Sequence, residues 1–286
     1  TTGTRNLAIG FGAYDASDTE NDNLAIGYEA MTTNTAGGTQ NVMIGNYAGD
    51  ALTSGDNNTA VGHLAMTTHT TGSNNTAFGH SALEDNTTGS GNTAIGDHTL
   101  SNNETADSNT AIGRYAMQSN TTGAANIAVG HQALTANTTG TRNTAIGYQA
   151  YDASDTENDN LAIGYQAMTT NTAGGTKNVA LGNYALDALT SGDDNTALGY
   201  NSMTGVTSGS NNTAVGKDAM GATVTGSNNT AIGKDCMSAL TTGGNNVSVG
   251  NTALVAITTG TENVAIGFEA MRLVTGASSS VAIGNE

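Results

Sequence analysis

The sequence predicts an all-β fold, a parallel β-solenoid of about 17 rungs with 17 residues each, and three observations support this prediction. A glycine recurs at intervals of 17 residues from Gly10 to Gly284, with only two intervals of 18. An asparagine stands four residues before this glycine in 16 of the 17 copies. A triplet such as Thr59-Ala60-Val61 lies between the two. A short, strict period of this kind indicates rungs that pack mainly on their neighbours.

The triplet is the first element of each rung, and we expect it to be extended. Thr59 and Val61 then share one face, while Ala60 takes the other. The glycine that follows forms a corner, because it adopts positive φ without steric cost. A second apolar column stands four residues after the glycine, and we expect it in the core: Met31, Met66, Leu83, Leu100, Met117, Leu134, Met168 and Leu186. A Thr-Thr-Gly phrase or a relative then turns the chain toward the next asparagine.

Seventeen residues are too few for a helix, a strand and two connections. We therefore expect two strands of about five residues and two tight turns in each rung. Eight of the nine methionines belong to the second apolar column and are expected to fill the core, whereas Met43 stands elsewhere. Rungs stacked at the usual strand spacing of about 4.8 Å would form a rod roughly 80 Å long.

The recurring asparagines are predicted to have a structural role. Stacking identical rungs brings like residues into columns, so the side-chain amides can form hydrogen bonds from rung to rung. The alternative is a role in ligand binding. The predicted asparagine ladder comprises Asn6, Asn23, Asn41, Asn58, Asn75, Asn92, Asn109, Asn126, Asn143, Asn160, Asn178, Asn195, Asn212, Asn229, Asn246 and Asn263.

Composition excludes several classes of partner. The net charge is −17 and only seven residues are basic, so we expect no nucleic acid partner and no adsorption to anionic lipid. No apolar run reaches the roughly 20 residues that insertion into a membrane requires. The single cysteine, Cys236, stands in a column of alanines (Ala219, Ala253, Ala270) and is expected to be a small buried residue. The absence of proline fits a backbone whose N–H groups are nearly all paired.

The array, 1–286, is predicted to contain a duplication. Residues 2–62 match residues 139–199 at 51 of 61 positions, which indicates two eight-rung blocks, 2–138 and 139–275, and a closing partial rung, 276–286. The two 18-residue intervals, Gly27 to Gly45 and Gly164 to Gly182, fall at the same place in the two blocks. Each contains Thr-Ala-Gly-Gly-Thr. The core of one rung is thin, so we expect several chains to share a core by burying alanine and threonine columns against each other.

An acidic phrase, Asp-Ala-Ser-Asp-Thr-Glu-Asn-Asp, replaces the usual turn once in each block. Its carboxylates could bind Ca²⁺, which takes six to eight oxygen ligands. The alternative is a solvated acidic turn, since the phrase lacks the spacing of known calcium motifs. Beyond this possible Ca²⁺ we expect no cofactor. The candidate ligands are Asp15, Asp18, Glu20, Asp22, Asp152, Asp155, Glu157 and Asp159.

A second metal hypothesis concerns histidines. His63 and His80 occupy one column on adjacent rungs, Asp97 follows in that column, and His98 is its neighbour. Imidazoles this close could bind a transition metal. The alternative is an exposed variable position, because the same column also holds Tyr28, Asn46, Arg114 and Lys217.

The phrase Asn-Thr-Ala-Ile-Gly, with an alanine three residues after the glycine, resembles the head repeats of trimeric autotransporter adhesins. Ser279-Ser280-Val281-Ala282-Ile283-Gly284 is the closest match to their signature. The longer phrase at 71–79 also resembles repeats of bacteriophage tail fibres and secreted adhesin-like proteins. The resemblance covers the whole chain and implies a left-handed parallel β-roll that assembles as a homotrimer. The rungs here are longer than those usual in adhesin heads.

The predicted function is that of an extracellular fibrous structural protein rather than an enzyme, because a regular solenoid offers no pocket in which a nucleophile and a base converge. We expect a rod or filament segment of an adhesin-like or tail-fibre-like appendage, at a cell surface or on a virion, with a role in surface adhesion. Its partners would be copies of itself, as a trimer or an end-to-end filament, and a host or environmental surface. The alternatives are a solenoid that binds host glycan or ice, and a Ca²⁺-stabilised β-roll.

Overall fold

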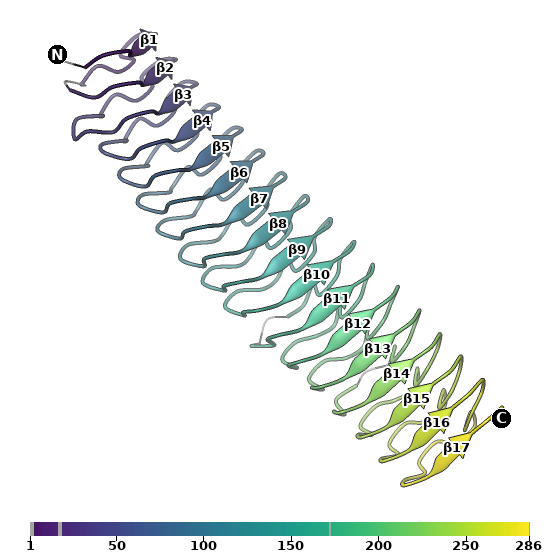
Figure 1. The fold of residues 1–286 in the computed structure, drawn as a ribbon. Helices are drawn as coiled ribbons and strands as arrows, with labels where there is room; N and C mark the ends of the chain where they lie inside the picture. The colour runs from purple at the N-terminus through teal and green to yellow at the C-terminus, as the bar shows by residue number, and fades with distance from the viewer. Residues whose placement is uncertain (1–2, 17–18, 172, 223, 286) are drawn as a thin grey trace. The chain divides into compact units, whose positions relative to one another are not determined.

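The computed structural model describes residues 3–16, 19–171, 173–222 and 224–285, and its fold is a parallel β-solenoid (Figure 1). It contains 17 strands and, in the part of the chain that it describes, no helix. The all-β solenoid predicted from the sequence is thereby confirmed. The chain divides into two compact units, Thr1–Arg142 (unit 1) and Asn143–Glu286 (unit 2).

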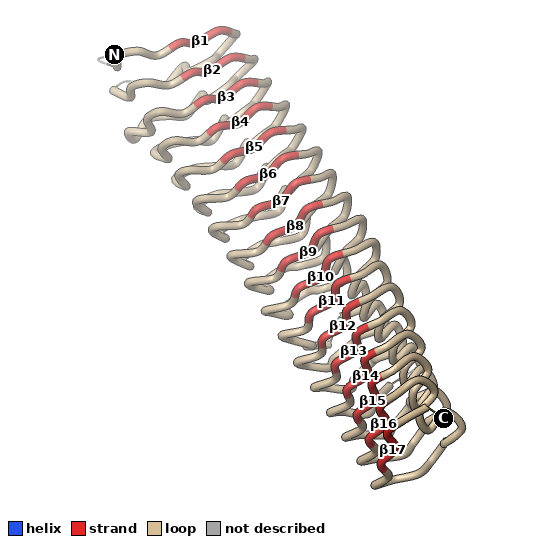
Figure 2. The backbone as a smooth tube through the Cα atoms, turned by 45° about the vertical axis from the view of Figure 1, so that its right-hand side comes forward, coloured by secondary structure: helices blue, strands red, loops and turns tan. Residues whose placement is uncertain are grey.

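The strands of unit 1 all pair in parallel, each with the next along the chain. Identical or similar residues lie opposite each other, as in Ala94 against Ala111. Figure 2 shows these strands as short segments joined by long irregular connections. The strands of unit 1 are β1 (Leu7–Ile9), β2 (Leu24–Ile26), β3 (Val42–Ile44), β4 (Thr59–Val61), β5 (Thr76–Phe78), β6 (Thr93–Ile95), β7 (Thr110–Ile112) and β8 (Ile127–Val129).

Unit 2 is built in the same way. Its strands also pair in parallel and in register, and the 18-residue interval does not disturb this, since Ala162 still lies opposite Ala180. Its strands are β9 (Thr144–Ile146), β10 (Leu161–Ile163), β11 (Val179–Leu181), β12 (Thr196–Leu198), β13 (Thr213–Val215), β14 (Thr230–Ile232), β15 (Val247–Val249), β16 (Val264–Ile266) and β17 (Val281–Ile283).

The expectation of two five-residue strands per rung was wrong, because each rung holds one strand of three residues. Left-handed residues interrupt the remainder, including Leu64 (φ 59°) and Met66 (φ 54°). The backbone still bonds to both neighbouring rungs there. The Leu64 N–H donates to the Asn46 carbonyl oxygen of the preceding rung (3.1 Å), and the Met66 N–H donates to the Ala82 carbonyl oxygen of the following rung (3.0 Å). The alternation of backbone handedness therefore replaces a second strand without leaving these amides unpaired.

The recurring glycine is required for two reasons, which Gly45 illustrates. Its φ is +140°, a conformation that residues with a side chain rarely adopt. A Cβ atom there would lie 2.3 Å from the carbonyl oxygen of Gly62, on the next rung. The period of the sequence thus marks a place where successive rungs approach too closely for a side chain.

Three columns of small or apolar residues run through the core of each unit. These are the central residue of the strand, the residue three places after the glycine and the residue four places after it, as in Ala60, Ala65 and Met66, all fully buried. The prediction for the second apolar column is confirmed: Met31, Met66, Leu83, Leu100, Met117, Leu134, Met168 and Leu186 are 0% exposed. We had expected the strand alanines to face another chain, and this was wrong: they fill the interior of their own unit. Small residues are needed there because a large residue faces them.

Cys236 and Met43 follow the same packing rule. Cys236 is buried in an alanine column with its Sγ 2.8 Å from Ser248 Oγ, and burial raises the pKa of the thiol. Met43 occupies the strand-alanine column, and Gly49 stands where methionine or leucine is usual. A Cβ on Gly49 would lie 2.6 Å from Met43 Sδ. The large and small residues have exchanged places, so the Met43 side chain fills the space that Gly49 leaves.

Candidate functional site

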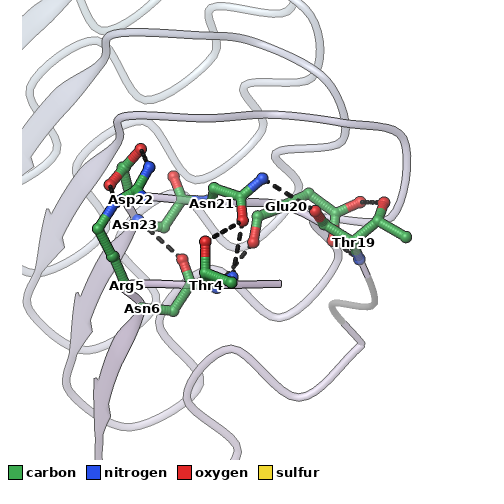
Figure 3. Close-up of polar contacts among 8 residues, drawn as sticks. All are labelled: Thr4, Arg5, Asn6, Thr19, Glu20, Asn21, Asp22 and Asn23. Atoms are coloured by element: carbon green, nitrogen blue, oxygen red, sulfur yellow. Dashed lines mark hydrogen bonds and ion pairs between the residues drawn. The ribbon is translucent and has the colours of Figure 1, made fainter. Parts of the chain in front are cut away.

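The predicted asparagine ladder lies on the inside of the corner before each strand. From Asn41 to Asn263 its side chains are buried. The Asn41 Nδ2 atom donates to the Gly55 carbonyl oxygen (2.8 Å), while the Asn41 Oδ1 atom accepts the backbone N–H of Asn58 (2.9 Å). Figure 3 shows the first such link, in which Asn6 binds the backbone of Glu20 and Asn23 in the same way. Each amide therefore joins its own rung to the backbone of the next, and its polar atoms are occupied by the protein.

A second buried asparagine column, seven residues after the glycine, was not predicted. In unit 1 the Nδ2 atoms of Asn103, Asn120 and Asn137 each donate to the Oδ1 atom of the preceding member, at 2.8–2.9 Å. The first member, Asn86, contacts the buried His69, whose pKa is lowered by burial. The signal was present in the recurring phrase Asn-Thr-Thr-Gly, which we assigned to a turn. The predicted column contains such a run as well, because Asn229, Asn246 and Asn263 each donate from Nδ2 to the Oδ1 atom of the preceding member at 3.0–3.1 Å.

The acidic turns place their carboxylates apart from one another. Asp18 lies outside the described residues, Asp15 and Asp155 are exposed, and Asp152 is half-buried, with its pKa raised by burial. Asp22 pairs with Arg5, whose Nη2 lies 2.6 Å from Asp22 Oδ2 (Figure 3). Asp159 is exposed. Among the described residues, no three carboxylates of these turns come within reach of one ion. The calcium hypothesis for this set stays a prediction.

The glutamates of the two acidic turns point inward and explain the 18-residue intervals. Glu20 and Glu157 are 2% and 3% exposed and stand where a turn glycine is usual. Glu157 Oε2 accepts the N–H groups of Asp155 (2.9 Å) and Thr156 (3.1 Å), and its Oε1 accepts that of Gly174 (3.0 Å). Glu20 binds Gly37 in the same manner (3.2 Å). The extra residue of the next rung therefore makes room for a buried carboxylate and supplies a hydrogen-bond donor to it.

The outer face of the strands forms a regular surface on each unit. The third residue of every strand points outward and is aliphatic or aromatic, with Phe78 57%, Ile112 39% and Leu198 42% exposed. The first residue of each strand points the same way and is threonine or an aliphatic residue. No strand position carries a charged residue. We call these two outward columns the strand face; it is an uncharged, half-exposed apolar surface that repeats at every rung.

A column of rings lies beside the strand face, at the first or second position after the glycine. In unit 1 each of eight consecutive rungs contributes one ring, and neighbouring ring centroids are 4.9–6.2 Å apart. We call it the ring ladder: Phe11, Tyr28, Tyr47, His63, His80, His98, Tyr115 and His131. Unit 2 has a run of four consecutive rings, Tyr148, Tyr165, Tyr184 and Tyr200, followed by Lys217, whose Nζ lies 5.8 Å from the Tyr200 centroid. This ladder was not predicted from the sequence, because the ring stands at the first position after the glycine in some rungs and at the second in others.

Three residues of the ring-ladder region come together. His80, Asp97 and His98 each place one possible ligand atom within 4.8 Å of the others. Among the residues that the structure describes, this is the one group of three or more histidine, cysteine, aspartate or glutamate side chains with such geometry.

Neither a scan against protein-family models nor a search of curated proteins finds a match for this chain. In the described part of the chain no helix is long and apolar enough to span a membrane.

Proposed function

We propose that this chain is a rod segment of an extracellular fibre, an adhesin-like or tail-fibre-like appendage, and that its copies associate through the strand face into a left-handed β-roll trimer. The strand face is the observation that carries the proposal. Contiguous exposed apolar surface on soluble proteins marks interaction sites. Here that surface recurs at every rung of both units.

A second copy of the same chain fits the strand face better than an unrelated partner. A surface that repeats every rung is matched along its whole extent only by a partner with the same repeat. The acidic residues that give the net charge of −17 lie outside the strands, so they do not oppose contact between strand faces. Closed rotational symmetry satisfies such a surface on every copy. The trimer follows the resemblance to adhesin head repeats.

The mass of the full chain in solution tests this proposal. We expect light scattering after size exclusion to give three chains, and the double variant Ile95→Lys/Ile112→Lys to give one, because a desolvated lysine at two adjacent rungs is incompatible with an apolar interface. The matched control is Thr88→Lys/Thr105→Lys, which adds the same charge at exposed turn positions of adjacent rungs. It should remain a trimer. A monomeric wild-type protein, or a control that dissociates as well, would contradict the proposal.

Ice binding is the second candidate, and one observation favours it. Thr59, Thr76, Thr93 and Thr110 form an outward column on consecutive strands β4–β7 beside the aliphatic column. A trimer interface and an ice-binding surface would use the same face, so they exclude each other. Strong inhibition of ice recrystallisation by a monomeric wild-type protein would favour ice binding over the fibre. Glycan binding by the ring ladder is less well supported, because the stacked rings partly cover one another's faces.

A further inference from the structure

We propose that His80, Asp97 and His98 form a binding site for a divalent transition-metal cation of the Cu²⁺ and Zn²⁺ type. Two imidazoles and one carboxylate are the ligand set that these cations accept, whereas Ca²⁺ and Mg²⁺ prefer oxygen ligands alone. This inference does not depend on the proposed fibre function.

The fold brings the three side chains together through the stacking of two rungs. His80 follows the glycine of one rung, and Asp97 follows the glycine of the next. The backbone N–H of His98 donates to the carbonyl oxygen of His80 (2.9 Å), which joins the two rungs at this point. The rings of His80 and His98 meet edge to face with their centroids 4.9 Å apart. This backbone contact therefore fixes the positions from which the His80 and His98 side chains project.

The two oxygen atoms of the Asp97 carboxylate have different neighbours, and Arg114 orients the group. Its Oδ1 atom lies 3.0 Å from His80 Nδ1, and its Oδ2 atom accepts a hydrogen bond from Arg114 Nε (3.1 Å). Arg114 in turn stacks over the Tyr115 ring, with its Cζ atom 4.4 Å from the centroid. Asp97 would thus offer one oxygen to the cation. The side chains of His80 and Asp97 are 46% and 39% exposed, so water can complete the coordination.

Unit 2 contains a natural comparison, because the duplication aligns His80, Asp97 and His98 with Lys217, Lys234 and Asp235. The two lysines are paired with the aspartates that follow them, Lys217 with Asp218 (3.4 Å) and Lys234 with Asp235 (3.1 Å). Two ammonium groups repel a cation and cannot ligate it while protonated. We therefore expect one site per chain, in unit 1.

To test this site, the chain is produced without a histidine tag and titrated with Cu²⁺. Calorimetry measures the stoichiometry and affinity, and electron paramagnetic resonance identifies the ligands. We expect one Cu²⁺ per chain with nitrogen hyperfine coupling from two imidazoles. His98→Gln and Asp97→Asn should each lower the affinity at least about tenfold. His131→Gln removes a histidine of the same ring ladder outside the cluster and should leave the affinity within about twofold. An equal loss in His131→Gln, or unchanged binding in His98→Gln, would overturn the site.

A gain-of-site variant separates a defined site from general binding by surface histidines. Lys217→His/Lys234→Asp/Asp235→His recreates the cluster in unit 2 on positions that the duplication aligns. We expect the stoichiometry to rise from one Cu²⁺ per chain to two, with the same spectrum. A stoichiometry that stays at one would show that the stacked-rung geometry alone does not create the site and would refute the proposal. Circular dichroism of each variant verifies that the β-structure is retained.

Discussion

When the sequence is aligned at the predicted repeat of 137 residues, the two units differ in what they bury at aligned positions. In unit 1, Asn103 and Asn120 belong to a buried amide ladder, whereas the aligned residues of unit 2 are the fully buried Leu240 and Ile257. The ring ladder follows the same division. Unit 1 has eight consecutive rings, and unit 2 has four before lysine replaces them.

The difference teaches that the buried residues of this fold are matched along a column, from one rung to the next, rather than one at a time. Each buried side chain has its closest like neighbours one rung before and one rung after it. A polar column is satisfied if the amides continue from rung to rung, and an apolar column is satisfied if the aliphatic residues continue. The backbone accommodates either a polar or an apolar column at this position, because the recurring glycine and the asparagine four residues before it are the same in both units.

The largest expected effect concerns the Met43 and Gly49 pair, whose counterparts in unit 2 are Ala180 and Leu186. Met43→Ala alone should lower the free energy of unfolding by about 2–5 kcal/mol, because it leaves a cavity. Gly49→Leu alone should cost about 1–3 kcal/mol by overpacking against Met43. The double variant should return to within about 1 kcal/mol of wild type, because it recreates the packing of unit 2. Urea denaturation and native-state hydrogen exchange at residues 42–52 measure this.

The backbone permits the exchange, since Leu186 adopts φ 53° where Gly49 has φ 59°. The reciprocal pair Ala180→Met/Leu186→Gly in unit 2 is the matched control and should be similarly neutral as a pair. A double variant no more stable than Met43→Ala would show that the two units differ in backbone as well as in side chains.

The second-largest expected effect on stability concerns the second buried asparagine column of unit 1. Asn120→Ile should cost about 1–3 kcal/mol, because it removes the hydrogen bond between Asn120 Nδ2 and Asn103 Oδ1 and leaves a buried oxygen with fewer donors. The triple variant Asn103→Leu/Asn120→Ile/Asn137→Val copies the unit 2 column. It should cost less than the sum of the three single changes, since polar partners are removed together. Chemical denaturation of the three single variants and the triple variant measures the difference. If the three single losses in free energy of unfolding add up to the loss of the triple variant, the members of the column do not depend on one another, which would contradict this interpretation.

The smallest effect is a difference in pH dependence. The hydrogen bond from Arg5 lowers the pKa of Asp22 in unit 1, whereas burial raises the pKa of Asp187 in unit 2. A lowered pKa stabilises the fold above the ordinary aspartate value of about 4, and this stability is lost as the pH falls below it. A raised pKa acts in the opposite direction, so Asp187 contributes stability below about pH 4 that is lost as the pH rises.

Asp187→Asn should therefore raise stability at pH 7 by less than about 1 kcal/mol and leave it unchanged in acid, since the group is partly exposed. Asp22→Asn should lower stability at pH 7 and have no effect in acid. Denaturation curves at neutral pH and near pH 3 test both signs. Desolvation also raises the pKa of Asp85 in unit 1, and this group should behave like Asp187, so the comparison concerns these groups and not the whole units.

The sequence predicted the solenoid, its parallel register and much of its core, because each depends on a period that glycine and asparagine make visible. It did not predict the single short strand per rung. Left-handed φ at residues such as Leu64 and Met66 contradicts their local preference and is supported only by hydrogen bonds to adjacent rungs. For the candidate sites, it placed His63, His80, Asp97 and His98 near one another. It could not select three of them, since that depends on which side chains converge across two rungs.

The sequence by itself determined the period, the internal similarity at an offset of 137 residues and the glycine, asparagine and apolar columns that recur from rung to rung. Only the tertiary structure decided which way each column points: alanine inward, the strand face outward, and Glu20 and Glu157 into the space that an extra residue opens on the next rung. The physical reason is that a rung of 17 residues has no interior alone. Inside and outside are defined only when its backbone bonds to the rungs on either side, and these contacts lie about one period away in the sequence.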